Sequence, residues 1–459
     1  EFNLTLENGQ EALEILGISL VNFPPETISS SELVNLPVMT NLSIILAMEI
    51  LNLIYAPACF AESAIALPIL YTMLDLSRRY GNSTVSPYAY AVYGNIVAWQ
   101  LLDINLAYQL GELALTVVDR LNAKTVSPQV NVAVYINLTY KKRHIQETIE
   151  PLLLSIQEAL EVGDIEFACH NASFYCEHLF LVGKNLEEVN GIQKQYLKFI
   201  ADSKQDHQLN LTKITAQVVE NLMSNSNNPS CLDGEIISES DTIAYLKQNN
   251  NRILLFNIYH YKSFLSYLFH SFQTAIKACE TALEYAGFVQ AEILFTEHKL
   301  FYSLALLAQY SYASNQQGKN EGLKQVETNQ NLMEVWADHA PMNFQHRYEL
   351  VEAEKARVLG NTKTAMEFYD CAIAGAKENG YIQYVALANE LAGAFYLELG
   401  REKIAQTYLA EAHYAYRRWN AVAKVKDLES RYPQFRLTET IPQPNIKRDI
   451  TIDSTTSSN

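Results

Sequence analysis

The sequence has few basic residues and no cysteine framework, and both shortages restrict what it can do. Its 459 residues include 34 lysines and arginines against 51 aspartates and glutamates, which gives a formal net charge of −17. Nucleic-acid surfaces need clustered lysine and arginine, and here only Tyr140–His144 is locally basic, a stretch that we interpret as a solvent-exposed helix face. The six cysteines lie far apart, which favours a reducing compartment over a secreted one, and we expect a cytoplasmic protein that binds no nucleic acid.

The sequence also lacks phosphate-binding and catalytic motifs. Gly183–Lys184 and Gly318–Lys319 miss both the upstream glycine and the following serine or threonine of a P-loop. There is no kinase glycine-rich loop, H-R-D, D-F-G, H-E-x-x-H, G-x-S-x-G or C-x-x-C. We therefore predict that the chain is not an enzyme and needs no cofactor. A cryptic hydrolase is the catalytic alternative, and it would require two carboxylates or a Cys–His pair that meet in a cleft.

No apolar run is long and uninterrupted enough to predict a membrane span. The most apolar stretch, 42–71, is broken by polar residues and prolines, among them Glu49 and Pro57. A membrane-spanning helix needs about 20 predominantly apolar residues in succession. We instead predict a buried helix over 42–55, with Thr40 as its N-cap.

What the sequence does contain is a repeated helical unit, which is clearest as two copies between Leu350 and Ala415. Each copy is a helix, a turn at a glycine, and a second helix with small residues at the spacing Ala-x3-bulky-x2-Ala, which places them on one helical face. The glycine suits the turn because helix C-caps favour a positive φ. An offset of 40 residues aligns Gly360 with Gly400, Ala365 with Ala405, Tyr369 with Leu409, and Ala372 with Ala412.

The same small-residue spacing occurs elsewhere, and no stretch of useful length alternates as a β-strand does. The unit matches the second half of a tetratricopeptide (TPR) pattern, whose usual period is about 34 residues. We predict an all-α protein with a TPR-like α-α superhelix, in which antiparallel helix pairs stack because no pair buries its apolar face alone. The spacing is found at 103–114, 163–175, 270–282, 360–372 and 400–412.

Polar stretches divide this predicted superhelix. We predict an N-terminal helical block at 1–222, a polar loop at 223–242 and a C-terminal helical block at 243–436. The tail at 437–459 is rich in Ser, Thr and Pro and has little to bury, so we predict a disordered linker there.

Several long strings resemble the helical repeat region of the large multidomain signalling kinases typical of cyanobacteria. They are "RRYGNSTVSPYAYAVYG" (78–94), "LEVGDIEFACHNASFYCEHLF" (160–180), "VETNQNLMEVWADHAPMNFQHRYELVEAE" (326–354), "AMEFYDCAIAGAKENGYIQYVALANELAGAFYLELG" (365–400) and "AQTYLAEAHYAYRRWNAVAKVKDLESRYP" (405–433). In that family a serine/threonine kinase domain is followed by an AAA-type (STAND) ATPase module, the helical region, a GAF domain and a histidine-kinase module. The resemblance implies that this chain lies between the ATPase module and the GAF domain, without the catalytic modules of its ATP-binding parent. The sequence departs from the family at Asn420, where Gly is usual, and at His170, where Cys is frequent.

One stretch contains the residue types of a metal site. Cys169 and Cys176 are seven residues apart and share a helical face, whereas His170 and His178 point mostly away from that face. Structural zinc needs four converging ligands. We therefore interpret the stretch as a repeat helix that buries cysteine as a small apolar residue, and we predict no metal site.

Polar and aromatic residues give two candidate sets for contacting a partner. The first set surrounds a helix start at Pro341, and the second consists of tyrosines on first helices, which line the concave face of a TPR superhelix. Tyrosine suits a peptide groove because it combines a large contact area with a polar tip. Local capping and packing between repeats are the alternatives for both sets. The candidates are Tyr259, Tyr302, His339, Asn343, His346 and Tyr348.

These observations favour a non-catalytic scaffold that binds a protein or peptide partner, or neighbouring modules of its own chain. In the context that the resemblance implies, it would relay a signal between ATPase and kinase modules of a signal-transduction kinase. The alternative is a sensor that holds a small molecule or peptide inside the superhelix and thereby controls the attached kinase.

Overall fold

A computed structural model of the chain describes residues 2–24, 30–61, 63–224, 228–310 and 316–435. Within these residues the regular elements are helices, and a single isolated bridge joins Val38 to Asn82. The prediction of an all-α fold is confirmed. The predicted linker at 437–459 lies outside the described residues.

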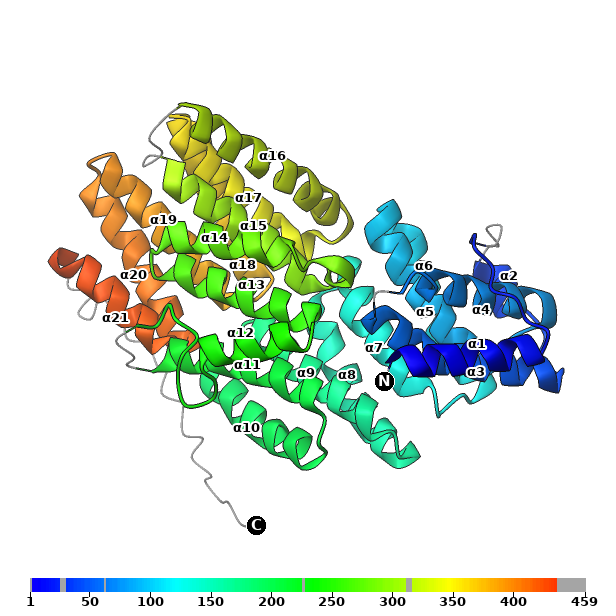
Figure 1. The fold of residues 1–459 in the computed structure, drawn as a ribbon. Coiled ribbons are helices and arrows are strands. Elements are labelled where there is room, and N and C mark those ends of the chain that lie inside the picture. Colours follow the sequence, from blue (N-terminus) through cyan, green and yellow to red (C-terminus); the bar gives the residue numbers. More distant parts are fainter. Residues whose placement is uncertain (1, 25–29, 62, 225–227, 311–315, 436–459) are drawn as a thin grey trace, which may run out of the picture.

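The first third of the described chain forms a lobe around its own hydrophobic core, which extends from Leu6 to Leu138 (Figure 1). The lobe includes a short π-helical turn, η1, and its helices pack mostly against their neighbours in sequence. They are α1 (Phe2–Ile15), α2 (Ser30–Val34), α3 (Leu42–Phe60), α4 (Ala66–Tyr80), α5 (Ser86–Ile96), η1 (Val97–Leu101), α6 (Ile104–Leu121) and α7 (Ser127–Asn137).

The rest of the described chain packs around a second, larger core from Ile136 to Phe435. Three-residue to five-residue 3-10 turns connect some of its helices. The elements are η2 (Thr139–Lys141), η3 (Ile145–Thr148), α8 (Ile149–Val162), α9 (Ile165–Leu181), α10 (Leu186–Asp202), α11 (Asp206–Met223), α12 (Glu239–Gln248), α13 (Arg252–Leu268), α14 (Phe272–Leu283), η4 (Gly287–Ala291), α15 (Ile293–Gln309), α16 (Gln316–His339), α17 (Pro341–Val358), α18 (Thr362–Glu378), α19 (Ile382–Glu398), α20 (Glu402–Trp419), α21 (Val422–Arg431) and η6 (Pro433–Phe435).

The repeated unit corresponds to the helix pairs α17–α18 and α19–α20. Gly360 and Gly400 lie at the two turns with φ of 77° and 71°, which is the left-handed conformation that the sequence predicted for them. On α18 the buried residues include Ala365, Tyr369 and Ala372, at the predicted spacing. The stacked helical hairpins of the prediction are therefore present.

Alternate helices form an inner layer, and the helices between them cover it. On α15, 14 of 17 residues are buried, and on α13, 13 of 17, whereas on α18 only four of 17 are buried. Contacts run in order from α9 through α11, α13, α15 and α17 to α19. These six inner helices have apolar residues on most sides because each is surrounded by protein.

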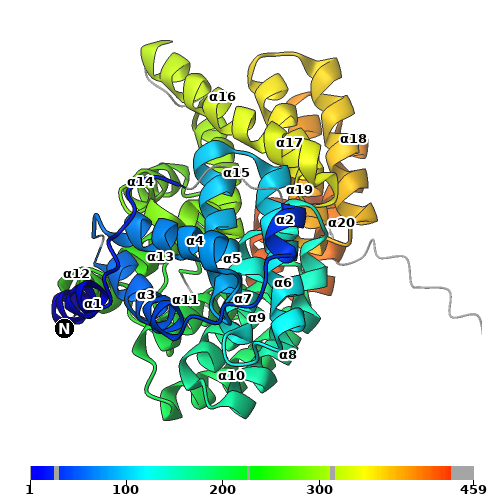
Figure 2. The same cartoon turned by 90° about the vertical axis from the view of Figure 1, so that its right-hand side faces the viewer.

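The inner layer closes on itself. The side-chain amide of Gln383, at the start of α19, donates to the carbonyl of Leu181, at the end of α9, at 2.7 Å. Near the same place Trp419 packs on Phe180 with 5.9 Å between ring centroids. We refer to α8–α21 as the ring; in Figure 2 the lobe lies in front of it, with α16 at the top, α17–α20 to the right and α8–α10 below.

The two cores meet near residue 138, and the larger core continues across the predicted polar loop. That loop is observed between the end of α11 at Met223 and the start of α12 at Glu239, except for residues 225–227, which are not described. Leu232 and Ile237 of the loop are buried in the larger core. The division into blocks at 1–222 and 243–436 stays a prediction.

The helix α3 differs from the prediction in its cap, its length and its burial. Asn41 rather than Thr40 caps it, accepting hydrogen bonds from the backbone of Ser43 and Ile44 at 3.0 and 3.3 Å. The helix continues through Pro57 to Phe60. By length and composition alone it is the one described helix that could cross a membrane, and 39% of its most apolar 18 residues are buried. The buried-helix prediction holds for only one of its faces.

Candidate functional site

The interior of the ring holds an ion pair between Arg347 on α17 and Glu297 on α15. The Nη1 atom of Arg347 lies 2.7 Å from Oε1 of Glu297, and the two side chains are 0% and 4% exposed. The hydroxyl of Tyr384 on α19 donates to the other carboxylate oxygen of Glu297. The guanidinium lies 4.9 Å from the ring centroid of Tyr384 and 5.3 Å from that of Tyr381, so aromatic faces cover the cation. One charge pair thus joins three inner helices.

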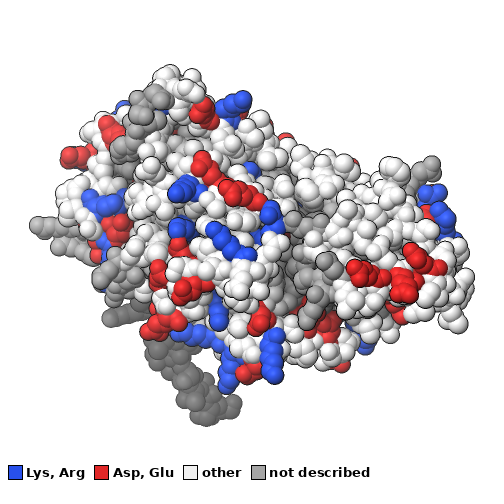
Figure 3. Space-filling model, viewed as in Figure 1, with Lys and Arg blue, Asp and Glu red and all other residues white. Residues whose placement is uncertain are grey.

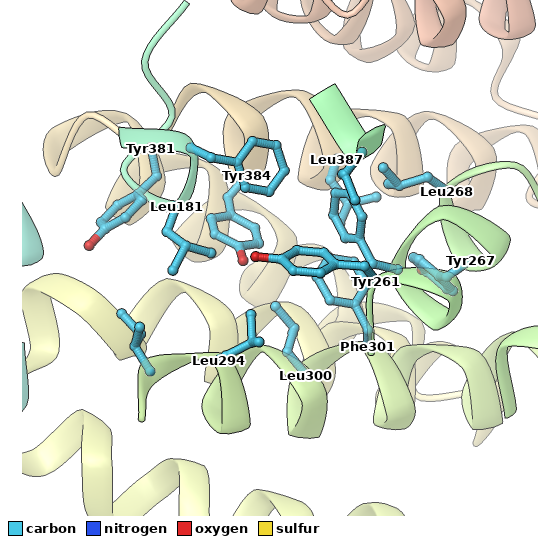
Figure 4. Packing of buried hydrophobic residues seen from close by; sticks show 14 of the residues in the cluster. Leu181, Tyr261, Tyr267, Leu268, Leu294, Leu300, Phe301, Tyr381, Tyr384 and Leu387 are labelled. Atoms are coloured by element: carbon cyan, nitrogen blue, oxygen red, sulfur yellow. The ribbon is translucent and has the colours of Figure 1, made fainter. Parts of the chain in front are cut away.

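A second buried carboxylate lies close to this pair. Glu177 on α9 accepts a hydrogen bond of 2.9 Å from the hydroxyl of Tyr261 on α13. Burial raises the pKa of Glu177 to about 7, although the hydrogen bond from Tyr261 lowers it in part. In Figure 4 the phenol oxygens of Tyr261 and Tyr384 point toward each other, and both tyrosines feel the charge of Glu297. We call Glu177, Tyr261, Glu297, Arg347 and Tyr384 the interior cluster.

Several polar atoms in and beside the interior cluster have no hydrogen-bond partner among the described residues. They include both ring nitrogens of His298 and of His346 and all three guanidinium nitrogens of Arg347, of which Nη1 has only its ion-pair contact with Glu297. Burial lowers the pKa of both histidines well below 6.5, with nearby positive charge adding to the effect, so the imidazoles are neutral. Buried polar groups in proteins nearly always have a protein or water partner. The interior therefore offers donors and acceptors to water or to a small polar ligand.

Asn343, a predicted partner-contacting residue, instead holds α17 to the segment that precedes α8. Its Nδ2 donates to the carbonyls of Tyr140 and Arg143 at 2.6 and 2.7 Å. Its Oδ1 accepts from the backbone of Ile145 at 3.1 Å and from the hydroxyl of Tyr381 at 2.7 Å. All of the hydrogen-bonding capacity of this buried amide is used, so Asn343 helps to close the ring.

The other predicted residues do not gather at one place. His346 is buried beside Asn343, with its ring 4.8 Å from that of Tyr381, whereas Tyr302 is buried on α15 and 6% exposed. Tyr259, His339 and Tyr348 are half-buried. Tyr259 stacks on Tyr285, and His339 bonds through Nδ1 to the carbonyl of its own helix at Val335. The prediction that these residues contact a partner stays a prediction.

The cysteines and histidines of the 169–178 stretch have separate surroundings. His178 shares a hydrogen bond of 2.6 Å between Nδ1 and the hydroxyl of Thr148. His170 instead stacks against Phe167 and His207, with ring centroids 5.4 and 6.0 Å away. Cys169 and Cys176 are fully buried on the inner helix α9. Their environment fits the interpretation as small apolar core residues.

A different group brings three potential metal ligands together at the C-terminal end of the ring. Ligand atoms of His270, Glu390 and Asp427 lie within 4.8 Å of one another. However, Lys424 already contacts Glu390 at 3.0 Å and Asp427 at 2.8 Å, and Arg431 pairs with both carboxylates. Burial by itself would raise the pKa of Glu390, but Lys424, Arg431 and His270 hold it well below its usual range. Two fixed cations occupy the carboxylates, so we interpret this group as a structural ion-pair network.

The residues that dominate both polar networks were not among the predicted site residues. Arg347 lies inside the stretch around Pro341, but the residues predicted there to contact a partner were its neighbours His346 and Tyr348. Glu297 is the single acidic residue of α15, and Glu390 lies in the middle of α19, whose other acid is at its last residue. A lone charge surrounded by apolar residues on every helical face is the available sequence signal for a buried pair, because a buried charge needs a partner.

Comparisons with known proteins give limited likenesses. No protein-family model matches the chain. Sixty residues, 13% of this chain and 2% of the relative's length, are 38% identical to hybrid signal transduction histidine kinase G of Dictyostelium discoideum. A solved structure, a circular tandem repeat protein with novel repeat topology and enhanced subunit contact surfaces, aligns over 89% of this chain and 96% of its own with 11% identity and a TM-score of 0.19. At that score the alignment adds no argument, and the assignment as a helical repeat fold rests on the helix pairs described above.

Proposed function

We propose that this chain is a non-catalytic interaction and regulatory scaffold of a multidomain signal-transduction kinase. All-helical repeat folds are typical of proteins that bind other proteins. The likeness of 60 residues to a histidine kinase supports a signalling context. In this proposal the parent is the cytoplasmic kinase–ATPase type of protein that the sequence resembles, and the chain relays a signal between its modules.

Ring closure is the observation that supports the proposal most. Residues about 200 positions apart are joined by the contacts of Gln383 with Leu181 and of Asn343 with Tyr140. A module that pulls on one end of the ring must therefore strain the other end. Such a body can transmit the state of one partner to another without any chemistry of its own.

A partner of the closed ring would bind its outside. The half-buried Tyr259, His339 and Tyr348 are accessible in part and remain in the proposal as contacts. Tyr302, Asn343 and His346 are buried, so they could contact a partner only if the ring opened.

The scaffold role can be tested by crosslinking in the source cells. A tagged copy of the chain is expressed there, crosslinked briefly and recovered, and the linked peptides are identified by mass spectrometry. We expect links from its surface lysines to kinase or ATPase modules, and no ATP hydrolysis by the purified chain. Absence of such links, or turnover of ATP by the chain alone, contradicts the proposal.

A second candidate, a sensor for a small polar ligand, is favoured by the unpartnered atoms of His298, His346 and Arg347. A ligand that satisfies these atoms would stabilise the closed ring and so report its own concentration to the attached modules. Native mass spectrometry of the chain purified from its own cells tests this role. A bound mass that is released on denaturation and is absent from a His346→Leu variant supports it, whereas the bare mass of the wild-type chain contradicts it.

A further inference from the structure

The helix α3 exposes a stripe of leucines that nothing in the lobe covers. Leu42, Leu46 and Leu53 are 80%, 47% and 70% exposed, and exposed Glu49 lies between them. Their spacing of four and seven residues places all four on one helical face. The opposite face, with Ala47, Leu51 and other apolar residues, is buried in the lobe core. An apolar stripe of this kind, interrupted by an acid, is typical of an interaction surface.

The neighbouring helix α1 has an exposed acidic face of its own, which points away from its contact with α3. It packs against α3 through Gly9, where an added Cβ would meet Ile54 at 2.4 Å, so the two helices are in close contact. Leu4, Glu7, Glu11 and Ile15 of α1 are exposed at the three-residue and four-residue spacing of one face. Figure 1 and Figure 2 both show α1 and α3 side by side. We call the exposed faces of α1 and α3 together the acidic leucine face.

The N-terminal segment that contains the acidic leucine face carries charged residues of one sign. Residues 1–77 contain nine aspartates and glutamates and no lysine, arginine or histidine. More than half of the net charge of the whole chain, −17, therefore belongs to its first 77 residues. Figure 3 shows acidic side chains gathered over α1. A surface of this sign attracts cationic partners and repels anionic ones.

We infer that the acidic leucine face docks a basic amphipathic helix of a protein partner. Leucines of such a helix would cover the exposed stripe of α3, its lysines or arginines would lie against Glu49, and the α1 carboxylates would add to the attraction at longer range. This is helix-in-groove recognition, in which apolar anchors supply affinity and charges supply orientation. The inference rests on the proposed scaffold role and adds the place of docking and the chemistry of the partner.

The charge pattern also separates this partner from the other occupants of an apolar face. An anionic membrane surface would be repelled by the exposed carboxylates of Glu7, Glu11 and Glu49. A second copy of the chain would bring Glu49 and the α1 carboxylates against their own equivalents, because a two-fold interface places the same patch on both sides. Only a cationic helix satisfies the leucines and the acids together.

The test measures binding of the full chain to a synthetic 18-residue helical peptide by fluorescence anisotropy. The peptide carries Leu at positions i, i+4, i+7 and i+11 with Lys on both flanks. We expect micromolar affinity that weakens as salt rises, as attraction between opposite charges requires. A scrambled peptide of the same composition has the same charge without an apolar face, and we expect it to bind at least tenfold more weakly.

Variants locate the site. Leu53→Asn removes an exposed anchor and should weaken binding about tenfold, and Glu49→Lys should weaken it and reduce its salt dependence. Leu154→Asn is the matched control, because Leu154 is 50% exposed on α8 in the ring, and we expect it to bind as the wild type does. Circular dichroism checks that each variant keeps its helices, which the exposure of these positions leads us to expect.

Three results would overturn the inference. They are equal binding of the scrambled peptide, pelleting of the chain with phosphatidylcholine vesicles that Leu53→Asn abolishes, and self-association in sedimentation that Leu53→Asn abolishes. If the wild-type chain does not bind the peptide but still crosslinks to kinase or ATPase modules, this face is rejected as the docking site. The proposed scaffold role is then unaffected.

Discussion

The guanidinium of Arg347 lies 2.7 Å from the carboxylate of Glu297, and protein surrounds both groups. Each charge offsets the desolvation cost of burying the other, because an isolated ion in a protein interior costs roughly several kcal/mol. The pair joins α15 to α17, and the hydroxyl of Tyr384 extends it to α19. The ring interior is thus held by charge complementarity as well as by apolar packing.

Replacing Arg347 by Met should destabilise the chain strongly. Glu297 would then be a buried carboxylate without its cation, and breaking a buried pair from one side costs about 3–5 kcal/mol. Urea unfolding followed by circular dichroism measures the loss. The double variant Arg347→Met with Glu297→Gln should recover a substantial part of it, because the uncompensated charge is gone.

The exposed pair Lys363–Glu367 is the control for this experiment. Its atoms are 3.7 Å apart, and its side chains are 89% and 65% exposed. Lys363→Met should change the free energy of unfolding by about 0.5 kcal/mol or less. Similar effects of the two Met substitutions would show that the interior pair is not desolvated as the structure indicates.

The local part of the fold could be predicted from the sequence, and the long-range part could not. The residue types at Gly400 and Ala365 are determined by their own turn and by their own helical neighbours, so the spacing of such residues predicts the hairpins. Ring closure depends on Asn343 meeting Tyr140, 203 residues away, and no periodicity identifies that pair.

The same limit explains the outcome for the site and for α3. Arg347 lies in the stretch around Pro341, but its partner Glu297 lies 50 residues earlier in a different helix, and no local pattern links the two. The hydropathy of 42–55 predicts an apolar helix without saying which side neighbours cover. Leu53 is exposed because no helix of the lobe packs over it, which only the three-dimensional arrangement reveals.

Gly393 should not tolerate a methyl group. A Cβ at this position on α19 would lie 2.7 Å from Cγ of Leu409 on α20, where the repeat brings the two helices together. Gly393→Ala should therefore lower the free energy of unfolding by about 1–3 kcal/mol through overpacking. Gly191, inside α10, is the matched control, because a Cβ there meets nothing within 4 Å. Gly191→Ala should raise the free energy by about 0.5–1 kcal/mol, and opposite signs for the two variants are required.

Asn420 occupies a left-handed helix C-cap position of the kind that glycine usually fills. It ends α20 with φ of 70°, a left-handed conformation that asparagine adopts more readily than other residues with a side chain. Asn420→Gly should increase the free energy of unfolding by roughly 0.5–1 kcal/mol, since glycine adopts this conformation without a Cβ penalty. The thermal midpoint should therefore rise slightly. Asn420→Ala should lower it, and an increase with Ala would show that the left-handed conformation is absent.

Acid should destabilise the chain through His178. Burial lowers the pKa of this histidine to about 3, so the folded chain binds its proton only at that pH, whereas the unfolded chain binds it near 6.5. The contribution of neutral His178 is complete above pH 6.5 and is lost as pH falls from 6.5 toward 3, at about 1.4 kcal/mol per pH unit. Glu177, with a folded pKa of about 7, acts in the opposite direction as pH rises above its unfolded value.

The variant His178→Asn isolates this term. Its amide nitrogen can take the place of Nδ1 as the donor to Thr148, whose hydroxyl donates to the carbonyl of Ile145, and it does not titrate. Whatever the change in stability at pH 7, the further loss between pH 7 and pH 5 should be about 2 kcal/mol smaller in the variant, because Glu177 contributes equally to both proteins. Urea unfolding at the two pH values measures the difference, and the C2 proton of His178 followed by NMR checks its cause. A resonance that titrates near pH 6.5 in the folded chain would mean that His178 is hydrated and that the acid sensitivity arises elsewhere.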